Sequence, residues 1–222
     1  MKLTIFAATG RTGRRLLDAA VAAGHDVTAV VRDPAKLPAG VRAVTADLSS
    51  PDGAALERAV EGADAVLSAL GARSSAEAGH RIVARGTRAI VEAMRAAGVR
   101  RLVAISASPV ATVPSPGRPH PPRRDPAEGF LIAHVLGPFA KAAFHGVYAD
   151  LAEMEDVLRD SGLDWTVLRP PRLTDRPPKR YRTARGQNVP RGLSASRADV
   201  ADLMLRVLQE PETVGHPVGI AR

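Results

Sequence analysis

The sequence contains no cysteine among its 222 residues, and only 3% of them are aromatic. The missing cysteine excludes disulfide bonds and thiolate metal sites. The six histidines lack the spacing typical of metal ligands, so we expect no metal centre. Because 45% of the residues are nevertheless hydrophobic, the core must be built mainly from Ala, Val and Leu.

Long apolar runs are also missing. No stretch of about 18 apolar residues is present, which is what a membrane-spanning helix needs. The chain starts with Met1-Lys2-Leu3 and leads straight into a strand pattern rather than a signal peptide. We therefore expect a cytoplasmic protein without membrane contact, folded as a single domain over residues 1–222.

Acidic residues are fewer than basic ones, with 23 Asp and Glu against 31 Lys and Arg, which gives a formal net charge of +8. Such a balance can indicate a nucleic-acid partner. However, the cations are mostly arginines spread along the chain, and no recognition-helix or zinc-finger pattern accompanies them. We therefore favour a basic surface and a phosphate-bearing cofactor over nucleic-acid binding.

Residues 4–13 combine a short apolar strand, a turn of small residues and the start of a helix that runs to Gly24. The glycine-bearing turn leaves unpaired backbone N–H groups at the positive end of the helix dipole, where a phosphate can bind. Ala7 occupies the position of the first glycine in the dinucleotide-binding pattern, and its methyl group is expected to crowd the turn. A glycine turn without cofactor is the alternative interpretation.

Apolar runs then alternate with helical patterns. Strands are expected at residues 27–31, 41–46, 63–70, 101–106 and 163–169, with helices at 51–60 and 76–97. Nearly continuous apolar strands are typical of a parallel sheet covered on both faces. The sequence therefore predicts an α/β fold, with a single Rossmann-like, doubly wound domain and a mostly parallel sheet.

The second half of the chain is less regular. Residues 108–128 are rich in Pro, Arg and Ser, which indicates a lid or a mobile loop, and we prefer the lid. Beyond it, helices are expected at 130–144 and 148–159. A small antiparallel strand is expected at 180–184 and an edge strand at 217–221. Ser196 and Asp199 form a capping-box pattern that should open a helix reaching residue 209.

Arg32 follows the second expected strand. At this position an acidic residue binds the ribose 2′-hydroxyl of NAD, whereas an arginine suits the 2′-phosphate of NADP. Lys36 lies one helical turn further along. We therefore expect NADP(H) rather than NAD(H); the alternative is a surface arginine paired with Asp33.

Longer motifs point to a family. They are ATGRTG at residues 8–13, VRDP at 31–34, DL at 47–48, YAD at 148–150, SGLDWTVLRP at 161–170 and SRADVA at 196–201. With these motifs the chain resembles the atypical short-chain dehydrogenase/reductases with an NAD(P)H-binding domain. This group contains biliverdin reductase B (flavin reductase) and the NmrA-like proteins. The resemblance covers nearly the whole chain, but it says little about the substrate.

The resemblance implies a set of cofactor contacts. Arg32, with Lys36 beside it, would bind the 2′-phosphate, and Ser106 and Pro170 would flank the nicotinamide. The remaining positions are Thr9, Gly10, Arg11, Thr12 and Gly13 for the pyrophosphate, Asp47 and Leu48 for the adenine, and Ala69, Leu70 and Gly71 for the ribose and the cofactor wall.

The catalytic positions depart from the patterns that the resemblance implies. Ordinary short-chain dehydrogenases use Tyr-x-x-x-Lys, in which the lysine lowers the pKa of the tyrosine. Here Tyr148 is followed four residues later by Ala152. The Thr-Ser pair and the histidine of the flavin reductases are also missing, and Arg172 stands in the place of that histidine.

Three residues remain as catalytic candidates: Ser106, Tyr148 and Arg172. Arg172 is a fixed cation that can bind an anionic or electron-rich substrate group. Helical spacing places Tyr148 and Glu155 on one face, where Tyr148 could contact the substrate or pack in the core. We interpret Glu155 as a surface carboxylate rather than an acid.

Together these features predict an NADPH-dependent oxidoreductase that transfers a hydride to a small acceptor, namely a flavin, a quinone or a carbonyl compound. A non-catalytic, NADP(H)-sensing regulator of the NmrA-like kind is an alternative, as is a biosynthetic isomerase or epimerase. Both a monomer and a homodimer agree with the sequence.

Overall fold

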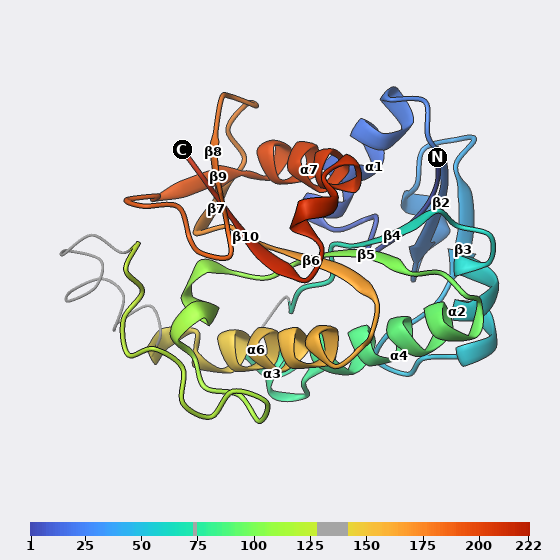
Figure 1. Ribbon diagram of the computed structural model, residues 1–222. Coiled ribbons are helices and arrows are strands. Elements are labelled where there is room, and N and C mark those ends of the chain that lie inside the picture. The colour runs from blue at the N-terminus through green and yellow to red at the C-terminus, as the bar shows by residue number, and fades with distance from the viewer. Residues whose placement is uncertain (73–74, 128–141) are drawn as a thin grey trace.

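The computed structural model describes residues 1–72, 75–127 and 142–222 (Figure 1). The helix expected over residues 130–144 lies mostly outside this part of the chain.

The centre of the fold is an eight-stranded sheet with the strand order β3-β2-β1-β4-β5-β6-β10-β8. Neighbouring strands are parallel except for β8 and β10, which confirms the predicted Rossmann-like α/β fold. The strands are β1 Lys2–Phe6, β2 Asp26–Val31, β3 Arg42–Thr45, β4 Ala65–Ser68, β5 Arg101–Ile105, β6 Asp164–Arg169, β8 Arg182–Arg185 and β10 His216–Ala221. The strand order reverses at β1, which pairs with both β2 and β4. In such folds the ligand crevice lies at this reversal, beyond the carboxyl ends of the strands.

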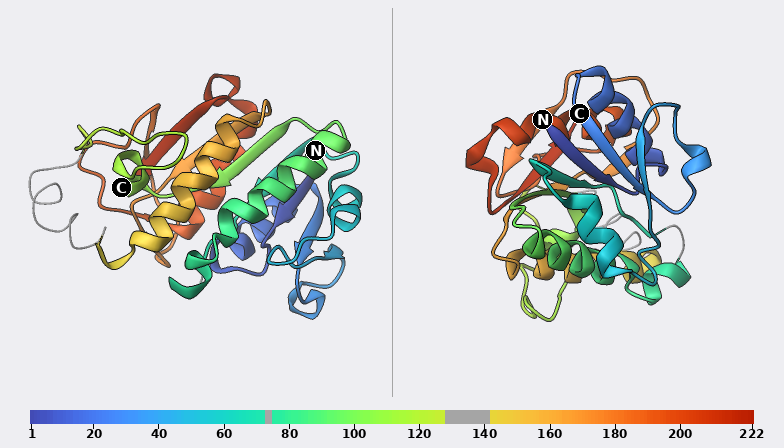
Figure 2. Two further views of the ribbon diagram at one scale, coloured as in Figure 1. Left: turned by 90° about the horizontal axis from the view of Figure 1, so that it is seen from below. Right: turned by 90° about the vertical axis from the view of Figure 1, so that its right-hand side faces the viewer.

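Helices cover both faces of the sheet (Figures 1 and 2). On one face α1 (Arg11–Ala22) packs against α7 (Arg197–Arg206), and on the other α2 (Gly53–Val60), α4 (Ile82–Ala96) and α6 (His145–Arg159) lie in a row. The alternation of strand side chains divides the core accordingly: Leu3 and Ile5 face α1 and α7, whereas Phe6 faces the other layer. Thr4 also faces that layer, and its hydroxyl donates a 2.6 Å hydrogen bond to the carbonyl of Ala59 in α2.

The continuous helix expected over residues 76–97 is interrupted. A short helix, α3 (Ser75–Gly79), is followed by Arg81 in the left-handed conformation (φ 53°), and α4 then begins at Ile82. Asp150 of α6 accepts hydrogen bonds from the N–H groups of Val83 (3.1 Å) and Ala84 (2.9 Å). The continuous helix was a wrong prediction because a distant side chain caps the new helix start.

The C-terminal strands also differ from expectation. Residues 217–221 were expected at the sheet edge, but β10 lies between β6 and β8, so the edge position was wrong. The small antiparallel strand is confirmed as β8, and it occupies the edge instead. Two short strands were missed: β7 (Arg172–Thr174) and β9 (Ser194–Ser196) form a separate parallel pair.

The predicted capping box is present at the start of α7. The Asp199 N–H donates to the Ser196 hydroxyl (3.1 Å), and the Ser196 N–H donates to the Asp199 carboxylate (3.0 Å). A turn of 3-10 helix, Val207–Gln209, extends the helical region to residue 209 as expected.

Residues 108–127 are the described part of the expected lid, and they are anchored at several points. After a 3-10 turn, Ser108–Thr112, the Ser115 hydroxyl and the Gly117 N–H each donate a 2.9 Å hydrogen bond to Asp156 of α6. At the other side, the Asn188 side chain donates to the Ser108 carbonyl (2.9 Å). The segment therefore connects α6 to the loop after β8, and its movement as a lid stays a prediction.

Candidate functional site

The turn after β1 brings the start of α1 very close to the end of the strand. Ala7 adopts the left-handed conformation (φ 57°), and the Gly10 N–H donates to its carbonyl (2.9 Å). A Cβ on Gly13 would lie 2.1 Å from that carbonyl oxygen, so only glycine permits this approach. The Ala7 methyl group is thus accommodated, although the backbone there is in a conformation that costs free energy for any residue with a Cβ.

The first turn of α1 offers backbone donors. Gly10 is the N-cap residue, and no described side chain caps the helix. The first N–H group that bonds within the helix is that of Arg14, which donates to the Gly10 carbonyl (2.8 Å). The preceding N–H groups, those of Arg11, Thr12 and Gly13, have no acceptor among the described residues. With the helix dipole, these donors form a set that fits a phosphate.

Leu48 and Leu70, two of the residues expected near the adenine and its ribose, both pack against Gly86 of α4. A Cβ on Gly86 would lie 2.7 Å from the Leu70 side chain and 3.3 Å from that of Leu48, so glycine lets both loops pack on the helix. Asp47 is exposed. Its carboxylate accepts a hydrogen bond from the Ser49 N–H (3.0 Å), and Ser49, with Arg32 nearby, holds the pKa of Asp47 below its ordinary value. Ala69 and Gly71 follow the end of β4. The Ala69 N–H donates a 3.2 Å hydrogen bond to the carbonyl of Phe6 at the end of β1.

Arg32 is exposed directly after β2, and no hydrogen bond or ion pair joins it to another described residue. The alternative interpretation was a surface pair with Asp33. In the structure Asp33 instead accepts from the Ala35 N–H (3.1 Å) and forms an ion pair with Lys36 (3.2 Å). The Arg32 guanidinium is therefore available to an anion, whereas the charge of Lys36 is already paired.

A buried network joins the ends of β5 and β6 to α6. The Ser106 hydroxyl donates to the Glu155 carboxylate (2.7 Å), and Arg169 donates to the same carboxylate through Nε (2.9 Å) and through Nη2. Ser106 is 4% exposed, Glu155 2% and Arg169 5%. Glu155 is therefore a buried ion-pair partner and not the expected surface carboxylate. The Ser106 proton is held by Glu155, which leaves the oxygen as an acceptor for a neighbouring group.

Tyr148 is half-buried on α6, and its ring meets that of Phe144 edge-on, with 6.2 Å between the centroids. Burial raises the pKa of its hydroxyl, which is opposite to what a lysine does in a Tyr-x-x-x-Lys site. No described residue hydrogen-bonds this hydroxyl. Tyr148 can thus donate a hydrogen bond to a ligand but is not activated as an acid.

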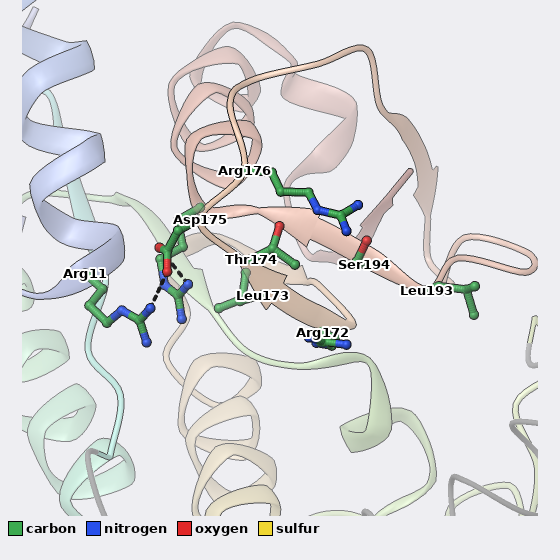
Figure 3. A pocket seen from close by; sticks show the side chains of 9 residues that line it. Arg11, Arg172, Leu173, Thr174, Asp175, Arg176, Leu193 and Ser194 are labelled. Atoms are coloured by element: carbon green, nitrogen blue, oxygen red, sulfur yellow. Dashed lines mark hydrogen bonds and ion pairs between the residues drawn. The ribbon is translucent and has the colours of Figure 1, made fainter.

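Arg172 lies in β7, beside a cavity of about 450 Å³ (Figure 3). The pairing of β7 with β9 places Arg172 opposite Ser194. The cavity is also lined by Arg11 from the glycine turn and by Arg176, which sequence reasoning missed. No local sequence signal shows that residues 172–174 and 194–196 pair, so the cavity was not predictable.

Within the described residues, no hydrogen bond or ion pair joins the three catalytic candidates to one another. Ser106 is buried beneath the ends of β5 and β6, Tyr148 lies on α6, and Arg172 lies in the β7–β9 sheet. Pro170, at the end of β6, accepts a hydrogen bond from the Ser108 N–H (2.9 Å), which keeps it close to the segment after β5. Over the described ranges, no group of three His, Asp or Glu side chains could hold a metal ion. In the same ranges, no helix has the length and apolar character needed to cross a membrane.

The model of the NAD(P)H-binding family matches residues 7–211. The chain belongs to this family. This confirms the predicted NAD(P)H-binding domain, and the match begins at Ala7 in the glycine turn. It does not distinguish NAD from NADP.

Two curated relatives agree with this assignment. A UPF0659 protein of Schizosaccharomyces pombe is 31% identical over 184 residues, which cover 78% of this chain and 72% of the relative. The 3-diazoavenalumate denitrifying reductase of a Streptomyces species is 36% identical over 126 residues. That match covers 48% of this chain and only 38% of the longer reductase. The name of the second relative, a reductase, agrees with the predicted class of NAD(P)H-dependent reductases.

Solved structures share the fold. The oxidoreductase ylbE of Lactococcus lactis superposes with a TM-score of 0.79 at 20% identity, covering 100% of this chain and 91% of its own. A short-chain dehydrogenase/reductase of Veillonella parvula in complex with NADP superposes with a TM-score of 0.74 at 19% identity, covering 100% and 94%. At these identities the likeness concerns the fold alone.

Proposed function

We propose that the protein is an NADPH-dependent reductase that transfers a hydride to a small acceptor, namely a flavin, a quinone or a carbonyl compound. The observation that carries the choice of NADPH is the exposed, unpaired Arg32 at the end of β2. A guanidinium there suits a 2′-phosphate, and no carboxylate is present at this position to bind a ribose 2′-hydroxyl.

The other residues bind and orient. The free N–H groups of the first turn of α1 would hold the pyrophosphate, as the helix dipole favours. Asp47 and Leu48 would contact the adenine, and residues 69–71 would form the ribose-side wall. Pro170 and the Ser106 oxygen would flank the nicotinamide. The bound cofactor supplies the hydride, and the chain supplies the orientation.

The acceptor is proposed from what the site lacks. Tyr148 has a raised pKa, the Ser106 proton is held by Glu155, and no lysine follows Tyr148 at the required spacing. These side chains are therefore poor proton donors to a substrate. Flavins and quinones need little active-site acid on reduction, so they fit the site better than simple ketones. A cytoplasmic location, and a monomer or homodimer, remain part of the proposal.

The cofactor choice is tested by Arg32→Ala. Loss of a charged hydrogen bond should weaken NADPH binding by about 1.5–3 kcal/mol. NADH binding should change little because NADH has no 2′-phosphate. Fluorescence titration of both cofactors measures this, with Arg58→Ala on the exposed side of α2 as the control for net charge. Equal weakening of NADH would contradict the assignment.

A second candidate is an NADP(H)-sensing regulator, which the weak proton-donating machinery favours. Its partner surface would include residues 108–127. NADPH oxidation with a panel of FMN, quinones and small carbonyl compounds separates the two. Turnover supports the reductase, and tight NADPH binding without any turnover favours the sensor. An isomerase or epimerase would instead convert its substrate without net NADPH consumption.

A further inference from the structure

We propose that the cavity between β7, β9 and the first turn of α1 binds an anionic group of the hydride acceptor, a carboxylate or a phosphate. Arg172 and Arg176 are its ligands. The inference rests on the proposed reductase function and adds the class of its substrate. Arginines from three segments of the chain line the cavity, and Figure 3 shows Arg11, Arg172 and Arg176 among them.

The charges of the lining residues do not balance. Four arginines line the cavity, against one carboxylate, that of Asp175. Both oxygens of Asp175 are engaged: Arg197 lies 2.9 Å from Oδ1, and Arg11 forms an ion pair with Oδ2. Arg172 and Arg176 have no hydrogen bond or ion pair with any described residue. Their charges therefore have no paired carboxylate among the described residues and are left to solvent, salt or a bound anion.

Other lining residues suit the rest of such a ligand. Ser194, which carries a hydroxyl, lines the cavity together with Arg176 (Figure 3). Leu193, also in the lining, is 63% exposed, which is unusual for a large apolar side chain among cations. An acceptor with an apolar ring system and an anionic substituent matches this combination. The planar guanidinium can bind a carboxylate or a phosphate through two parallel hydrogen bonds.

The cavity also has the right place in the fold. Arg172 follows Pro170 by two residues, and Pro170 is the residue proposed to flank the nicotinamide. Arg11 belongs to the turn proposed to hold the pyrophosphate. An acceptor anchored by Arg172 would therefore lie at the nicotinamide end of the cofactor.

The surrounding surface extends the positive charge. A second hollow of about 490 Å³ shares Arg176 and Ser194 with the first and is lined further by Lys179, Arg180 and Arg182. Clustered charge of one sign raises the local concentration and the association rate of oppositely charged ligands. Neutral acceptors would gain nothing from this field.

Two matched pairs of probes test the proposal. FMN and riboflavin share one ring system and differ by a phosphate, and 4-formylbenzoate and 4-formylbenzamide differ by a carboxylate. Dissociation constants are measured on the protein saturated with NADP⁺, so that no turnover is required. Wild type should bind the anionic member of at least one pair about tenfold more tightly, as one charged hydrogen bond predicts. The pair that responds shows whether the site takes phosphate or carboxylate.

In the double variant Arg172→Ala, Arg176→Ala the ratio within the responding pair should fall toward one. Arg58→Ala, which removes one exposed charge from α2, should retain the wild-type ratio. Thermal unfolding checks that the double variant is folded, which is expected because both arginines are exposed.

Three results would overturn the inference. One is equal binding of the charged and neutral members of both pairs by wild type. Another is an unchanged ratio in the double variant. The third is a loss of NADPH affinity in that variant, without acceptor, as large as the loss of FMN affinity, since the cavity would then serve the cofactor. Selective FMN binding without NADPH oxidation would instead contradict the reductase proposal and leave the anion site standing.

Discussion

The turn after β1 and the β7–β9 sheet both carry positive charge, but the charge has a different source in each. In the turn the charge comes from backbone N–H groups of α1, which are not titratable and are placed by the tight contact of Gly13 with Ala7. In the small sheet it comes from guanidinium groups on side chains such as Arg172. The Arg11–Asp175 ion pair joins the two regions.

The first region therefore depends on steric fit, and the second depends on side-chain charge. The backbone site depends on steric fit, so a single methyl group can close it. Around the side-chain site, the ionised carboxylates of Asp175 and Asp199 hold neighbouring arginines, namely Arg11, Arg197 and Arg222. Our proposals place the cofactor in the region shaped by the backbone contact and the acceptor in the region built from side chains.

Gly13→Ala tests the steric region and should have the largest effect. Its Cβ would lie 2.1 Å from the Ala7 carbonyl oxygen, so the turn must shift. We expect the free energy of unfolding to fall by about 3 kcal/mol, in the range of overpacked sites, and NADPH binding to weaken. Urea unfolding and NADPH titration measure the two effects.

Gly53→Ala is the matched control for this change. Gly53 lies in the first turn of α2, and a Cβ there would meet no atom within 4 Å. Its stability should equal or slightly exceed that of wild type because alanine is the better helix former. If Gly13→Ala were as stable as Gly53→Ala, the close contact would not define the turn.

The two regions also differ in how far the sequence predicts them. The glycine turn, its flanking strand and helix, and the exposed Arg32 follow from local spacing of apolar residues and glycines, so these features were expected. The break before α4 was not, because its cap comes from Asp150, far along the chain. Burial of Glu155 likewise depends on Arg169 in another element.

The arginine cavity shows the same limit. Residues 172–174 and 194–196 are short and lack the apolar alternation of a strand, and their pairing is set by packing beside α7 and β10. The interior position of β10 was mispredicted because nothing local shows that β8 pairs with its outer side. Side-chain sites built from distant segments therefore require the structure.

Asp199→Asn tests the charge-dependent region. One oxygen of Asp199 accepts from the Lys179 N–H (3.0 Å), the other from the Ser196 N–H (3.0 Å), and Arg222 donates to both. Burial alone would raise the pKa of Asp199, but these hydrogen bonds outweigh it and hold the pKa below its ordinary value. In the variant the side-chain NH₂ group would face the N–H donors that the carboxylate oxygens accept from in wild type. We therefore expect Asp199→Asn to lower the free energy of unfolding by about 2 kcal/mol near neutral pH.

The pH dependence of this loss has a definite sign. A lowered pKa in the folded state means that the stabilisation by ionised Asp199 is complete above the unfolded pKa of about 3.9. The stabilisation disappears as the pH falls through the lower folded pKa. The difference in unfolding free energy between wild type and Asp199→Asn should therefore shrink below about pH 4, as urea unfolding from pH 7 to pH 3 would show. A constant difference over that range would exclude the ionised carboxylate as its cause.

Ala7→Gly should have the smallest effect and the opposite sign. Ala7 holds φ at 57°, a conformation in which a Cβ is unfavourable by roughly 1–2 kcal/mol. Glycine removes this cost but gains conformational freedom in the unfolded chain, so the expected net stabilisation is about 0.5 kcal/mol. Ala8→Gly is the control, because Ala8 is buried and has no positive φ, and it should be destabilising. Urea unfolding measures the stability of both variants. An equal loss of stability in Ala7→Gly and Ala8→Gly would contradict backbone strain at Ala7. Opposite signs would show that the backbone at Ala7 is strained in the folded protein.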